Sequence, residues 1–594
     1  MTESRNQRLR RARPVLVLAA VAFALGAILG ARHTTSPAYA LAERFVSAWT
    51  HAKYLSMYED ITPSSQRSIT AGEFAQAYEQ ALTIATANTI KVAGKAHAAP
   101  HGAVAVPVCV RTRLFGTLAL DFTLHFSEAA NSGPRIAWSR SLEFPGLDPG
   151  ELLSRDTALP ERAPLLARDG SVLAEAAAGS DTSGQPTQAT RDSPLGDVAD
   201  AVLGEVGTIP ASRRQTLERE GVPGDAIVGL SGLELALDAH LRGSAGGALL
   251  AGKRVLAYAR PHTAQPLRTT VSPAVQRAAV TALGGQLGGV VAMQPSGQIL
   301  AVAGIGLDAL QPPGSTFKMV TTTGVLSAGI ASPHTVFPYA TSATLDGVKL
   351  NNANGEECGG SLELAFAVSC NSVFSPLGVK LGATRLVAMA ERFGFNHDPG
   401  IPGAAESTLP PASQIQGELD VGSTAIGQGQ VLASPLEMAI VAATIADGGR
   451  RPQPTFLPAP PSPSVTVASA SVAHVMRRLM IGVVREGTGT AAAIPGVTVA
   501  GKTGTAELKT CSSTTPAASS PEREGASNQP HEAAHEGCGG ESEAANTDAW
   551  FAAFAPALHP RIVVCVMLVK DGAGGATAAP VAREVIEAAL QAEH

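Results

Sequence analysis

The stretch LQPPGSTFKMVTTTGVL, residues 310–326, decides how the C-terminal half of this chain is interpreted. Prolines 312 and 313 and Gly314 break the chain, and the apolar residues that follow predict a helix that begins near Ser315. Lys318 comes three residues later, so its amine can reach the Ser315 hydroxyl on one helix face. A serine hydroxyl is a poor nucleophile until a neighbouring base takes its proton. A lysine can be that base if burial or a nearby positive charge lowers its pKa.

Two further motifs decide whether this pair carries chemistry, because an isolated SxxK usually marks only a solvated helix face. Ser369-Cys370-Asn371 follows an apolar, helix-like run, and Lys502-Thr503-Gly504-Thr505 follows IPGVT on a predicted strand. The second motif can relay a proton and hold a substrate amide. The third offers a cation and hydroxyls for a carboxylate, and we expect Gly504 to let a substrate backbone lie against the strand. SxxK, SxN and KTG in this order indicate acyl transfer through a serine.

The segments around these motifs predict an antiparallel sheet. GGVVAMQPSGQILAVAG (288–304) is typical of two buried strands joined by a Pro-Ser-Gly turn, and AWFAAFAP (549–556) and IVVCVMLVK (562–570) predict adjacent strands. The closing segment 580–594 predicts a helix with Val581, Val585 and Ala589 on the stripe that packs on this sheet. We therefore expect an α/β domain with helices on both sides of an antiparallel sheet.

The composition and the N-terminus narrow the function classes. The chain has 594 residues, of which 45% are hydrophobic, and a net charge of −6 that gives no basis for nucleic-acid binding. Five arginines precede an uncharged apolar run, residues 14–31, which is about long enough to span a bilayer. The arginines predict a cytoplasmic N-terminus and an extracytoplasmic bulk. An A-x-A site at 38–40 leaves a cleaved signal peptide as the alternative, but the apolar run is longer than a usual signal core.

Two units precede the motif-bearing segment, and neither contains a cluster of catalytic residue types. In the first, residues 41–58 predict helix with Leu41, Phe45 and Trp49 on one face. LALDFTLHF (118–126) alternates as a half-buried strand, and RIAWSRSLEF (135–144) is expected to be its neighbour, which makes this unit α+β. In the second, LLARDGSVLAE (165–175) predicts a hairpin and GLSGLELALDAHLRG (229–243) an amphipathic helix.

The motifs together resemble a known family. PPGSTFK, AVSCN, GQGQVLASPLEMA (427–439) and GKTGTAE resemble the transpeptidase domain of class B penicillin-binding proteins. SGLE with LRTTVSPAVQRAA (267–279) resembles the pedestal, or dimerisation, domain that precedes it. The early FVSAW and its surroundings resemble the NTF2-like domain of the methicillin-resistance type.

The resemblance implies a multidomain α+β chain. Residues 1–36 would be a cytoplasmic tail and transmembrane anchor, 37–145 the NTF2-like domain and 146–270 the pedestal. Residues 271–594 would be a transpeptidase domain with the penicillin-binding and serine β-lactamase-like fold, a central antiparallel sheet flanked by helices. That domain would contain a low-complexity insert, 509–547, between the KTG strand and AWFAAFAP. Its Ser, Thr, Pro, Ala, Glu and Gly cannot build a core, so we expect decoration rather than a gate over the cleft.

The resemblance also implies a reaction, the D,D-transpeptidation of peptidoglycan stem peptides. Ser315 would attack the penultimate D-alanine, with Lys318 as general base. Ser369 would pass a proton to the leaving amine, and Asn371 would orient Lys318 and the substrate amide. Lys502 would supply a positive field. The substrate carboxylate would be held by Thr503 and Thr505, beside Gly504, and the N–H groups of Ser315 and Thr505 would form the oxyanion hole.

Partners and alternatives follow from the same resemblance. β-Lactams would acylate Ser315, and the protein would sit in the bacterial cell membrane by a single pass. A glycosyltransferase or division and elongation proteins are candidate partners, and no cofactor, metal or nucleic acid is expected. A D,D-carboxypeptidase, a β-lactamase and a non-catalytic penicillin-binding sensor or scaffold remain as alternatives.

Three details stay open. HEAAH, residues 531–535, matches the zinc-protease pattern HExxH, but it lies in the insert without a packed helix, so no catalytic metal is expected. Cysteines 511 and 538 could form a bridge across the insert, whereas Cys370 could either pair with Cys358 or remain a buried thiol; cysteines 109 and 565 are predicted core residues. Ala553 replaces a glycine common in the family, which matters only if that position needs a positive φ.

Overall fold

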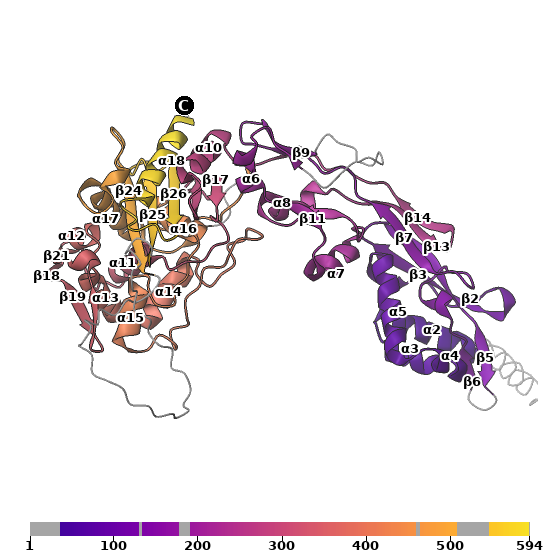
Figure 1. Ribbon diagram of the computed structural model, residues 1–594. Coiled ribbons are helices and arrows are strands. Elements are labelled where there is room, and N and C mark those ends of the chain that lie inside the picture. The colour runs from indigo at the N-terminus through magenta and orange to yellow at the C-terminus, as the bar shows by residue number, and fades with distance from the viewer. Residues whose placement is uncertain (1–35, 130–132, 177–190, 459–463, 508–545, 593–594) are drawn as a thin grey trace, which may run out of the picture. The chain divides into compact units, whose positions relative to one another are not determined.

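The computed structural model describes residues 36–129, 133–176, 191–458, 464–507 and 546–592 (Figure 1). The described chain falls into two compact units. Unit 1 comprises the described residues within 1–161, 208–226 and 243–263, and unit 2 comprises those within 162–207, 227–242 and 264–594. The expected pedestal segment, 146–270, therefore contributes to both units. The predicted anchor, 14–31, and most of the 509–547 insert lie outside the described residues.

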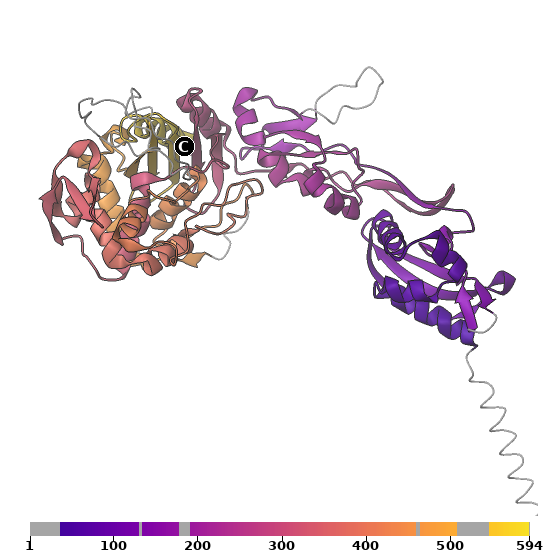
Figure 2. The ribbon, with the colours of Figure 1, turned by 60° about the horizontal axis from the view of Figure 1, so that its bottom comes forward.

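Unit 1 contains the expected α+β arrangement of helices on an antiparallel sheet (Figure 2). Its helices are α2 (Pro37–Thr50), α3 (Tyr54–Asp60), α4 (Pro63–Ser68), α5 (Ala71–Ile84) and α7 (Ala211–Glu220). Its main sheet has the order β1 (Ala87–Val92), β3 (Val104–Thr112), β2 (His97–Ala98), with β4 (Thr117–Leu124) also paired to β3. The helix predicted over residues 41–58 is broken after Thr50 into α2 and α3. Phe45 and Trp49 are buried on the predicted face of α2, and Met57 is buried on α3.

The predicted pairing of the alternating strand, 118–126, with residues 135–144 is confirmed only at its end, where Phe126 pairs with Ile136 and the Ala137 N–H donates to the His125 carbonyl at 2.9 Å. Strand β4 pairs with β3, whereas residues 133–136 form β6, which pairs with β5 (Phe126–Ala129). Only the first part of RIAWSRSLEF is extended, because a 3₁₀ turn begins at Arg140. The remaining strands of unit 1 are β7 (Leu153–Ala158), β13 (Gly246–Ala251) and β14 (Arg254–Ala259), which form a separate antiparallel sheet.

The N-terminal part of unit 2 confirms the predicted hairpin, β8 (Leu165–Leu166) with β9 (Val172–Ala176). The predicted amphipathic helix is broken at Leu237 into α8 (Gly232–Ala236) and α9 (Asp238–Leu241). The other elements here are β10 (Arg191–Asp192), α6 (Asp197–Leu203), β11 (Val206–Thr208), β12 (Ile227–Gly229) and β15 (Leu267–Arg268).

The two short helices α8 and α9 carry carboxylates of a buried ionic network. Glu234 lies 2.6 Å from Arg162 and 2.8 Å from Arg191, and Asp238 lies 2.9 Å from Arg162 and 2.6 Å from Arg242. Each carboxylate therefore contacts two guanidinium groups, as a charge removed from water requires.

A five-stranded antiparallel sheet forms the centre of the predicted transpeptidase segment. Its order is β17 (Ile299–Gly304), β16 (Gly288–Met293), β26 (Ile562–Leu568), β25 (Thr547–Ala555), β24 (Ala500–Glu507). The hairpin 288–304 and the pairing of residues 549–556 with 562–568 are both confirmed. Ala553 is not among the residues with positive φ, so an alanine replaces the common glycine without strain.

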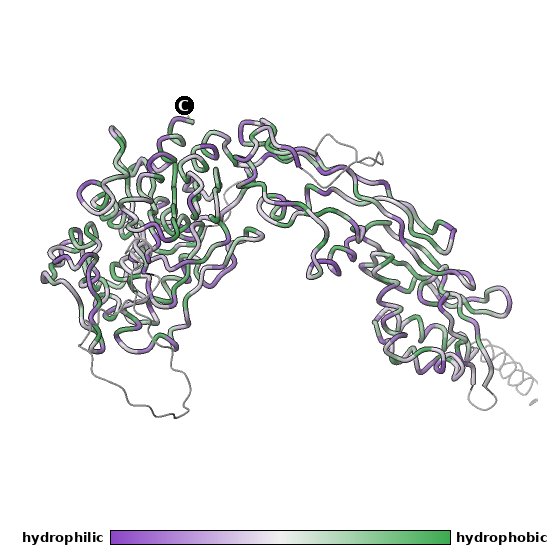
Figure 3. Tube along the Cα trace, in the orientation of Figure 1, coloured by the Kyte–Doolittle hydropathy of each residue, from purple (hydrophilic) through white to green (hydrophobic). Residues whose placement is uncertain are grey.

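Helices cover both faces of this sheet, as predicted. Along β25, Phe551 and Ala553 belong to the core beneath α10 (Pro273–Leu283) and α18 (Ala578–Ala592), whereas Trp550 and Phe554 belong to the core that includes α16 (Pro435–Ala446). Figure 3 shows the central strands in the hydrophobic colour, because a sheet buried on both faces needs apolar residues on both.

The remaining helices and strands of unit 2 complete the predicted transpeptidase segment. They are α11 (Lys318–Ser327), β18 (Val336–Ala340), β19 (Ser342–Leu345), β20 (Val348–Asn351), β21 (Cys358–Ser361), α12 (Leu362–Ala367), α13 (Asn371–Leu381), α14 (Ala383–Phe393), α15 (Gly417–Ala425), β22 (Arg450–Arg451), β23 (Val465–Thr466) and α17 (Ala470–Glu486). In the described part of the chain, no single helix is long and apolar enough to cross a membrane. Only α13 and α14 together meet that criterion, and they meet at a 100° bend.

Candidate active site

The nucleophile motif lies in a short 3₁₀ turn, Gly314–Phe317, directly before α11. Gly314 has φ +50°, and its N–H donates to the Gly427 carbonyl at 2.9 Å. A Cβ at position 314 would lie 2.8 Å from the Thr505 carbonyl oxygen. Glycine is therefore required here both for the left-handed backbone and for the close approach of the KTG strand.

The second motif lies between two helices. Ser369 follows α12 and has φ +63°, which is uncommon for a residue other than glycine and typical of strained functional positions. Cys370 forms a disulfide with Cys358, with Cα atoms 5.9 Å apart, so the bridge rather than the free thiol is the correct alternative. Asn371 then begins α13.

The amine of Lys318 brings the first two motifs together. Lys318 Nζ lies 2.9 Å from Ser315 Oγ, 3.2 Å from Ser369 Oγ, 2.7 Å from the Ser369 carbonyl oxygen and 2.7 Å from Asn371 Oδ1. The Lys318 side chain has no exposed surface, and its amine lies 5.5 Å from the centre of the Phe374 ring.

The third motif joins the same cluster through Lys502. Its Nζ donates to Ser369 Oγ at 2.9 Å and to the Thr503 carbonyl at 3.0 Å. It lies 5.6 Å from the centre of the Phe366 ring and is fully buried. Ser369 Oγ therefore lies between two lysine amines, one on each side.

Burial changes the protonation of both lysines. It lowers the pKa of Lys502 to about 7, because a buried ammonium loses its hydration. Burial, and secondarily the charge of Lys502, hold the pKa of Lys318 well below its ordinary value. The amine next to Ser315 is thus shifted toward the neutral form, which is the form that can accept a proton.

The KTG strand, β24, is an edge strand of the sheet, and Gly504 lies where it packs against the nucleophile turn. A Cβ at position 504 would lie 2.8 Å from the Pro313 carbonyl oxygen, 2.9 Å from Trp550 Cβ and 3.0 Å from Thr316 Cγ2. Gly504 thus lets the strand pack against the nucleophile turn. The expected room for a substrate backbone stays a prediction. Thr503 is buried, and Thr505 is half-buried.

Several residues of this site were not identified from the sequence. Thr488 Oγ1 lies 2.6 Å from Thr503 Oγ1, and Asn352 contacts the start of α13. Phe366 and Phe374 line the lysine amines. None of these residues stands in a motif or at a diagnostic spacing, so only their spatial contacts identify them.

Among the described residues, no carboxylate is a hydrogen-bonding partner of the cluster. In the part of the chain that the structure describes, the hydrogen-bonding partners of the Ser315, Lys318, Ser369, Asn371 and Lys502 side chains are hydroxyls, carbonyls and amides. Across the same residues, no three His, Cys, Asp or Glu side chains converge as a metal site would require. The HExxH match and cysteines 511 and 538 lie outside the described residues.

Comparison with known proteins assigns the chain. Residues 288–520 match the penicillin-binding protein transpeptidase domain, 185–254 the penicillin-binding protein dimerisation domain and 37–151 the NTF2-like N-terminal transpeptidase domain. The peptidoglycan D,D-transpeptidase PbpA of Mycolicibacterium smegmatis is 33% identical over 434 residues, which are 61% of this chain and 80% of that protein. The chain belongs to the class B penicillin-binding proteins.

Other members of the family agree with this assignment. The PbpA of Mycobacterium tuberculosis is 38% identical over 315 residues, 48% of this chain, and the match spans 55% of that relative, about half its length. The crystal structure of PBPA from M. tuberculosis has a TM-score of 0.56 and 28% identity, and covers 73% of this chain and 99% of that one. Its ceftriaxone acyl-enzyme complex has a TM-score of 0.55 at 28% identity, with 73% and 98% covered.

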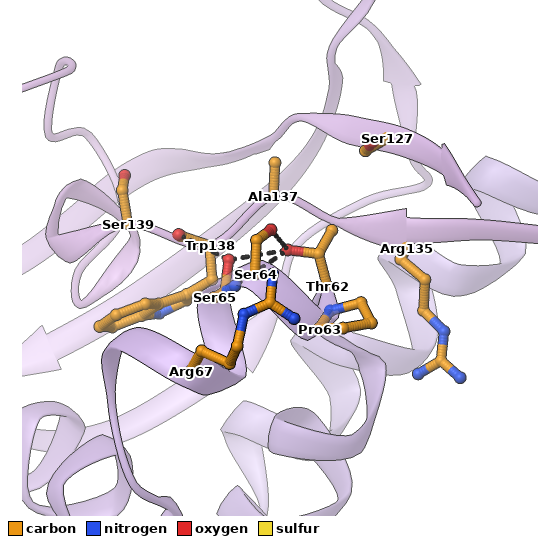
Figure 4. A pocket seen from close by; sticks show the side chains of 10 residues that line it. All are labelled: Thr62, Pro63, Ser64, Ser65, Arg67, Ser127, Arg135, Ala137, Trp138 and Ser139. Carbon is orange, nitrogen blue, oxygen red and sulfur yellow. Dashed lines mark hydrogen bonds between the residues drawn. The ribbon is translucent and has the colours of Figure 1, made fainter.

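This penicillin-binding protein also has a surface pocket in unit 1, apart from the three motifs (Figure 4). It has a volume of about 620 Å³ and includes Arg67, Arg135 and several hydroxyl side chains. Trp138 also lines the pocket, and its indole N–H donates to the Tyr78 hydroxyl at 3.2 Å. Among the described residues that line the pocket, several carry hydroxyls and none is a lysine or a histidine.

Proposed function

We propose that this chain is a peptidoglycan D,D-transpeptidase that crosslinks stem peptides through an acyl-enzyme on Ser315. The observation that carries the proposal is the set of atoms around Lys318 Nζ. Two of its four neighbours, the Ser369 carbonyl and Asn371 Oδ1, can only accept hydrogen bonds. A neutral amine has two N–H groups and one lone pair. When both N–H groups bond to these acceptors, the lone pair remains for the Ser315 hydroxyl at 2.9 Å.

The acylation step follows from this arrangement. Ser315 Oγ attacks the carbonyl of the penultimate D-alanine while its proton moves to Lys318 Nζ. The resulting oxyanion is held by backbone N–H groups of Ser315 and Thr505, where each donor is worth roughly 3 kcal/mol. The C–N bond to the terminal D-alanine then breaks. Ser369 gives its proton to the leaving amine, and its position between the two lysine amines lets Lys318 reprotonate it.

The KTG strand would hold the terminal carboxylate of the donor peptide. The hydroxyls of Thr503 and Thr505 lie on an edge strand, and Lys502 adds positive charge below its pKa of about 7. In the second half of the reaction, the amine of a neighbouring stem peptide attacks the Ser315 ester. The new amide bond forms, and Ser315 regains its proton.

The surroundings of Ser315 also favour a long-lived acyl-enzyme. Among the described residues, no carboxylate hydrogen-bonds to the five catalytic side chains. None of these bonds therefore places a carboxylate base where it could activate a water molecule to attack the ester. The rate of penicillin hydrolysis, measured below, separates the proposal from a β-lactamase. We further propose an extracytoplasmic location, with residues 14–31 as a single-pass anchor, and β-lactams as ligands. A glycosyltransferase or division and elongation proteins are proposed as partners on the resemblance alone.

Fluorescent penicillin tests the proposal on the full chain. Wild type should form a covalent adduct that survives denaturing gel electrophoresis, and Ser315→Ala should not. Ser327→Ala, an exposed serine at the far end of α11, is the matched control and should label normally. Equal labelling of wild type and Ser315→Ala would reject Ser315. Incubation with stem peptides should give crosslinked dimer and free D-alanine. Free D-alanine without dimer would indicate a carboxypeptidase, and rapid hydrolysis of penicillin would indicate a β-lactamase. Penicillin labelling without either peptide product would indicate a sensor.

A further inference from the structure

The side-chain amide of Asn371 has two different neighbours. Its Oδ1 lies 2.7 Å from Lys318 Nζ, and its Nδ2 donates to the Asn351 carbonyl oxygen at 2.8 Å. A primary amide has one accepting end and one donating end, and a backbone carbonyl can only accept. The Asn351 carbonyl therefore decides that Asn371 presents its oxygen, rather than its NH₂ group, to Lys318.

This orientation matters because the opposite one would disable the base. A flipped Asn371 would direct an N–H toward Lys318 Nζ and would donate to the lone pair that accepts the Ser315 proton. Asn371 is half-buried, and its contact with Asn351 lies at the surface, where water competes for both partners. The contact is reliable only if the segment that carries the Asn351 carbonyl is itself held in place.

Asn352 holds that segment. Only 5% of its surface is exposed, and its Nδ2 donates to the Ala340 carbonyl at 2.7 Å and to the Glu356 carbonyl at 2.9 Å. Its backbone N–H donates to the Thr341 carbonyl at 2.9 Å. These bonds tie the end of β20 to β18 and to the turn that precedes β21.

The remaining atom of the Asn352 amide reaches the SxN motif directly. Asn352 Oδ1 accepts a hydrogen bond from the Ser372 N–H at 2.8 Å, one residue after Asn371. This N–H belongs to the first turn of α13, where the N-cap residue normally supplies the acceptor. The N-cap here is Cys370, whose sulfur is bonded to Cys358 and makes no capping bond. Asn352 supplies the missing cap from another element.

We propose that Asn352 is a positioning residue for acylation, an inference that rests on the proposed function. Asn352 fixes the position of its neighbour Asn351 and, through the Ser372 N–H, the start of α13. These contacts keep the Asn351 carbonyl within hydrogen-bonding distance of the Asn371 amide. Asn371 Oδ1 then accepts a hydrogen bond from Lys318 Nζ, and the lone pair of Lys318 Nζ points at the Ser315 hydroxyl. Asn352 acts through Asn371 and does not touch the reacting atoms.

A double-mutant cycle on the full chain tests this. Penicillin acylation rates are measured for wild type, Asn352→Ala, Asn371→Ala and the double variant between pH 5 and 9. Asn352→Ala should lower the rate roughly ten- to a hundredfold, the usual cost of a misplaced catalytic group. In the Asn371→Ala background the same change should cost little, because the residue through which it acts is already gone. Glu357→Gln, an exposed residue on the same loop, is the control and should act like wild type.

Equal effects of Asn352→Ala in both backgrounds, or wild-type acylation by Asn352→Ala, would overturn the inference. Melting curves show whether each variant is folded at the assay temperature. If Asn352→Ala is not folded, the cycle is run with Asn352→Asp, which keeps the acceptor for the Ser372 N–H and loses both bonds that the Asn352 amide donates. Asn352→Asp should lower the acylation rate only when Asn371 is present. Failure of wild type to be labelled at all would reject the proposed function instead, so the two failures are distinguishable.

Discussion

Lys502 Nζ lies 2.9 Å from Ser369 Oγ, although 133 residues separate them in the chain. This contact joins the KTG strand to the SxN motif and, through Ser369, to Lys318. It makes the two buried amines neighbours of one hydroxyl. The charge on either amine therefore affects the other, so the proposed proton relay and the proposed carboxylate-binding cation form one electrostatic unit.

Removing the Lys318 amine should slow acylation without lowering the stability of the protein. In Lys318→Met, acylation by penicillin should fall by about 10²- to 10⁴-fold, the usual contribution of a general base. The free energy of unfolding should not fall, because the variant no longer buries an amine that occupies a fully desolvated position. A time course of penicillin labelling measures the acylation rate, and urea denaturation measures the free energy of unfolding. Lys349→Met, an exposed lysine on β20, is the control, and a normal labelling rate in Lys318→Met would contradict the role of base.

The pH dependence of acylation should reveal the coupling of the two lysines. Lys502 carries its charge below its pKa of about 7 and thereby lowers the pKa of Lys318. In Lys502→Met this repulsion is lost, the pKa of Lys318 rises, and a smaller fraction of Lys318 is neutral at a given pH. The acid limb of the acylation profile should therefore move to higher pH.

Lys502→Arg keeps a positive charge at this position and is the matched control. Its acid limb should stay at or below that of wild type, because the guanidinium remains charged at every pH of the assay. An unchanged acid limb in a folded Lys502→Met variant would show that the two amines are not coupled.

The disulfide between Cys358 and Cys370 should stabilise unit 2 near the SxN motif. The bridge closes a short loop, with a sequence separation of 12, and such a bridge is worth roughly 2–4 kcal/mol. Cys358→Ala should lower the midpoint of urea unfolding and make it insensitive to reductant, whereas wild type should lose stability when reductant is added. Cys109→Ala removes a free cysteine of unit 1 and should keep the response to reductant. A wild-type midpoint that reductant leaves unchanged would disprove the contribution.

A buried carboxyl on α16 should make stability fall with rising pH. Burial raises the pKa of Glu437 to about 8, against an ordinary value of 4.5, and Arg451 opposes this shift only in part. The folded state holds the proton more tightly than the unfolded state. The stabilisation is complete below about pH 4.5 and is lost as the pH rises to 8, at no more than about 1.4 kcal/mol per pH unit.

Glu437→Gln removes this titration and keeps the size of the side chain. Its free energy of unfolding relative to wild type should grow between pH 5 and 8 and level off above. Urea unfolding at several pH values measures this difference. A difference between the two proteins that is constant with pH would show that Glu437 does not titrate in this range.

Local patterns were enough for most of the secondary structure. The alternation in residues 118–126, the apolar strands around 288–304 and the spacing of Val581, Val585 and Ala589 each predict an element that the structure contains. The errors concern partners and breaks. Most of residues 118–126 pair with β3, and only the end of that segment pairs with residues 136 and 137. The predicted helix through Leu237 is broken. Periodicity reports which face of an element is buried, but several strands could satisfy the same face.

The candidate site divides in the same way. By itself the sequence determined the order and the residue types of three motifs, and hence the class of chemistry, because a serine with a lysine one turn later is a local relationship. Tertiary structure alone decided the rest. It brings Lys502 Nζ within hydrogen-bonding distance of Ser369 Oγ and pairs Cys370 with Cys358 in a disulfide. It also packs Gly504 against the nucleophile turn and places the Asn352 side chain as the cap of α13. These contacts join segments that are distant in sequence. The pKa values that make an amine a base depend on burial, which only the packed chain provides.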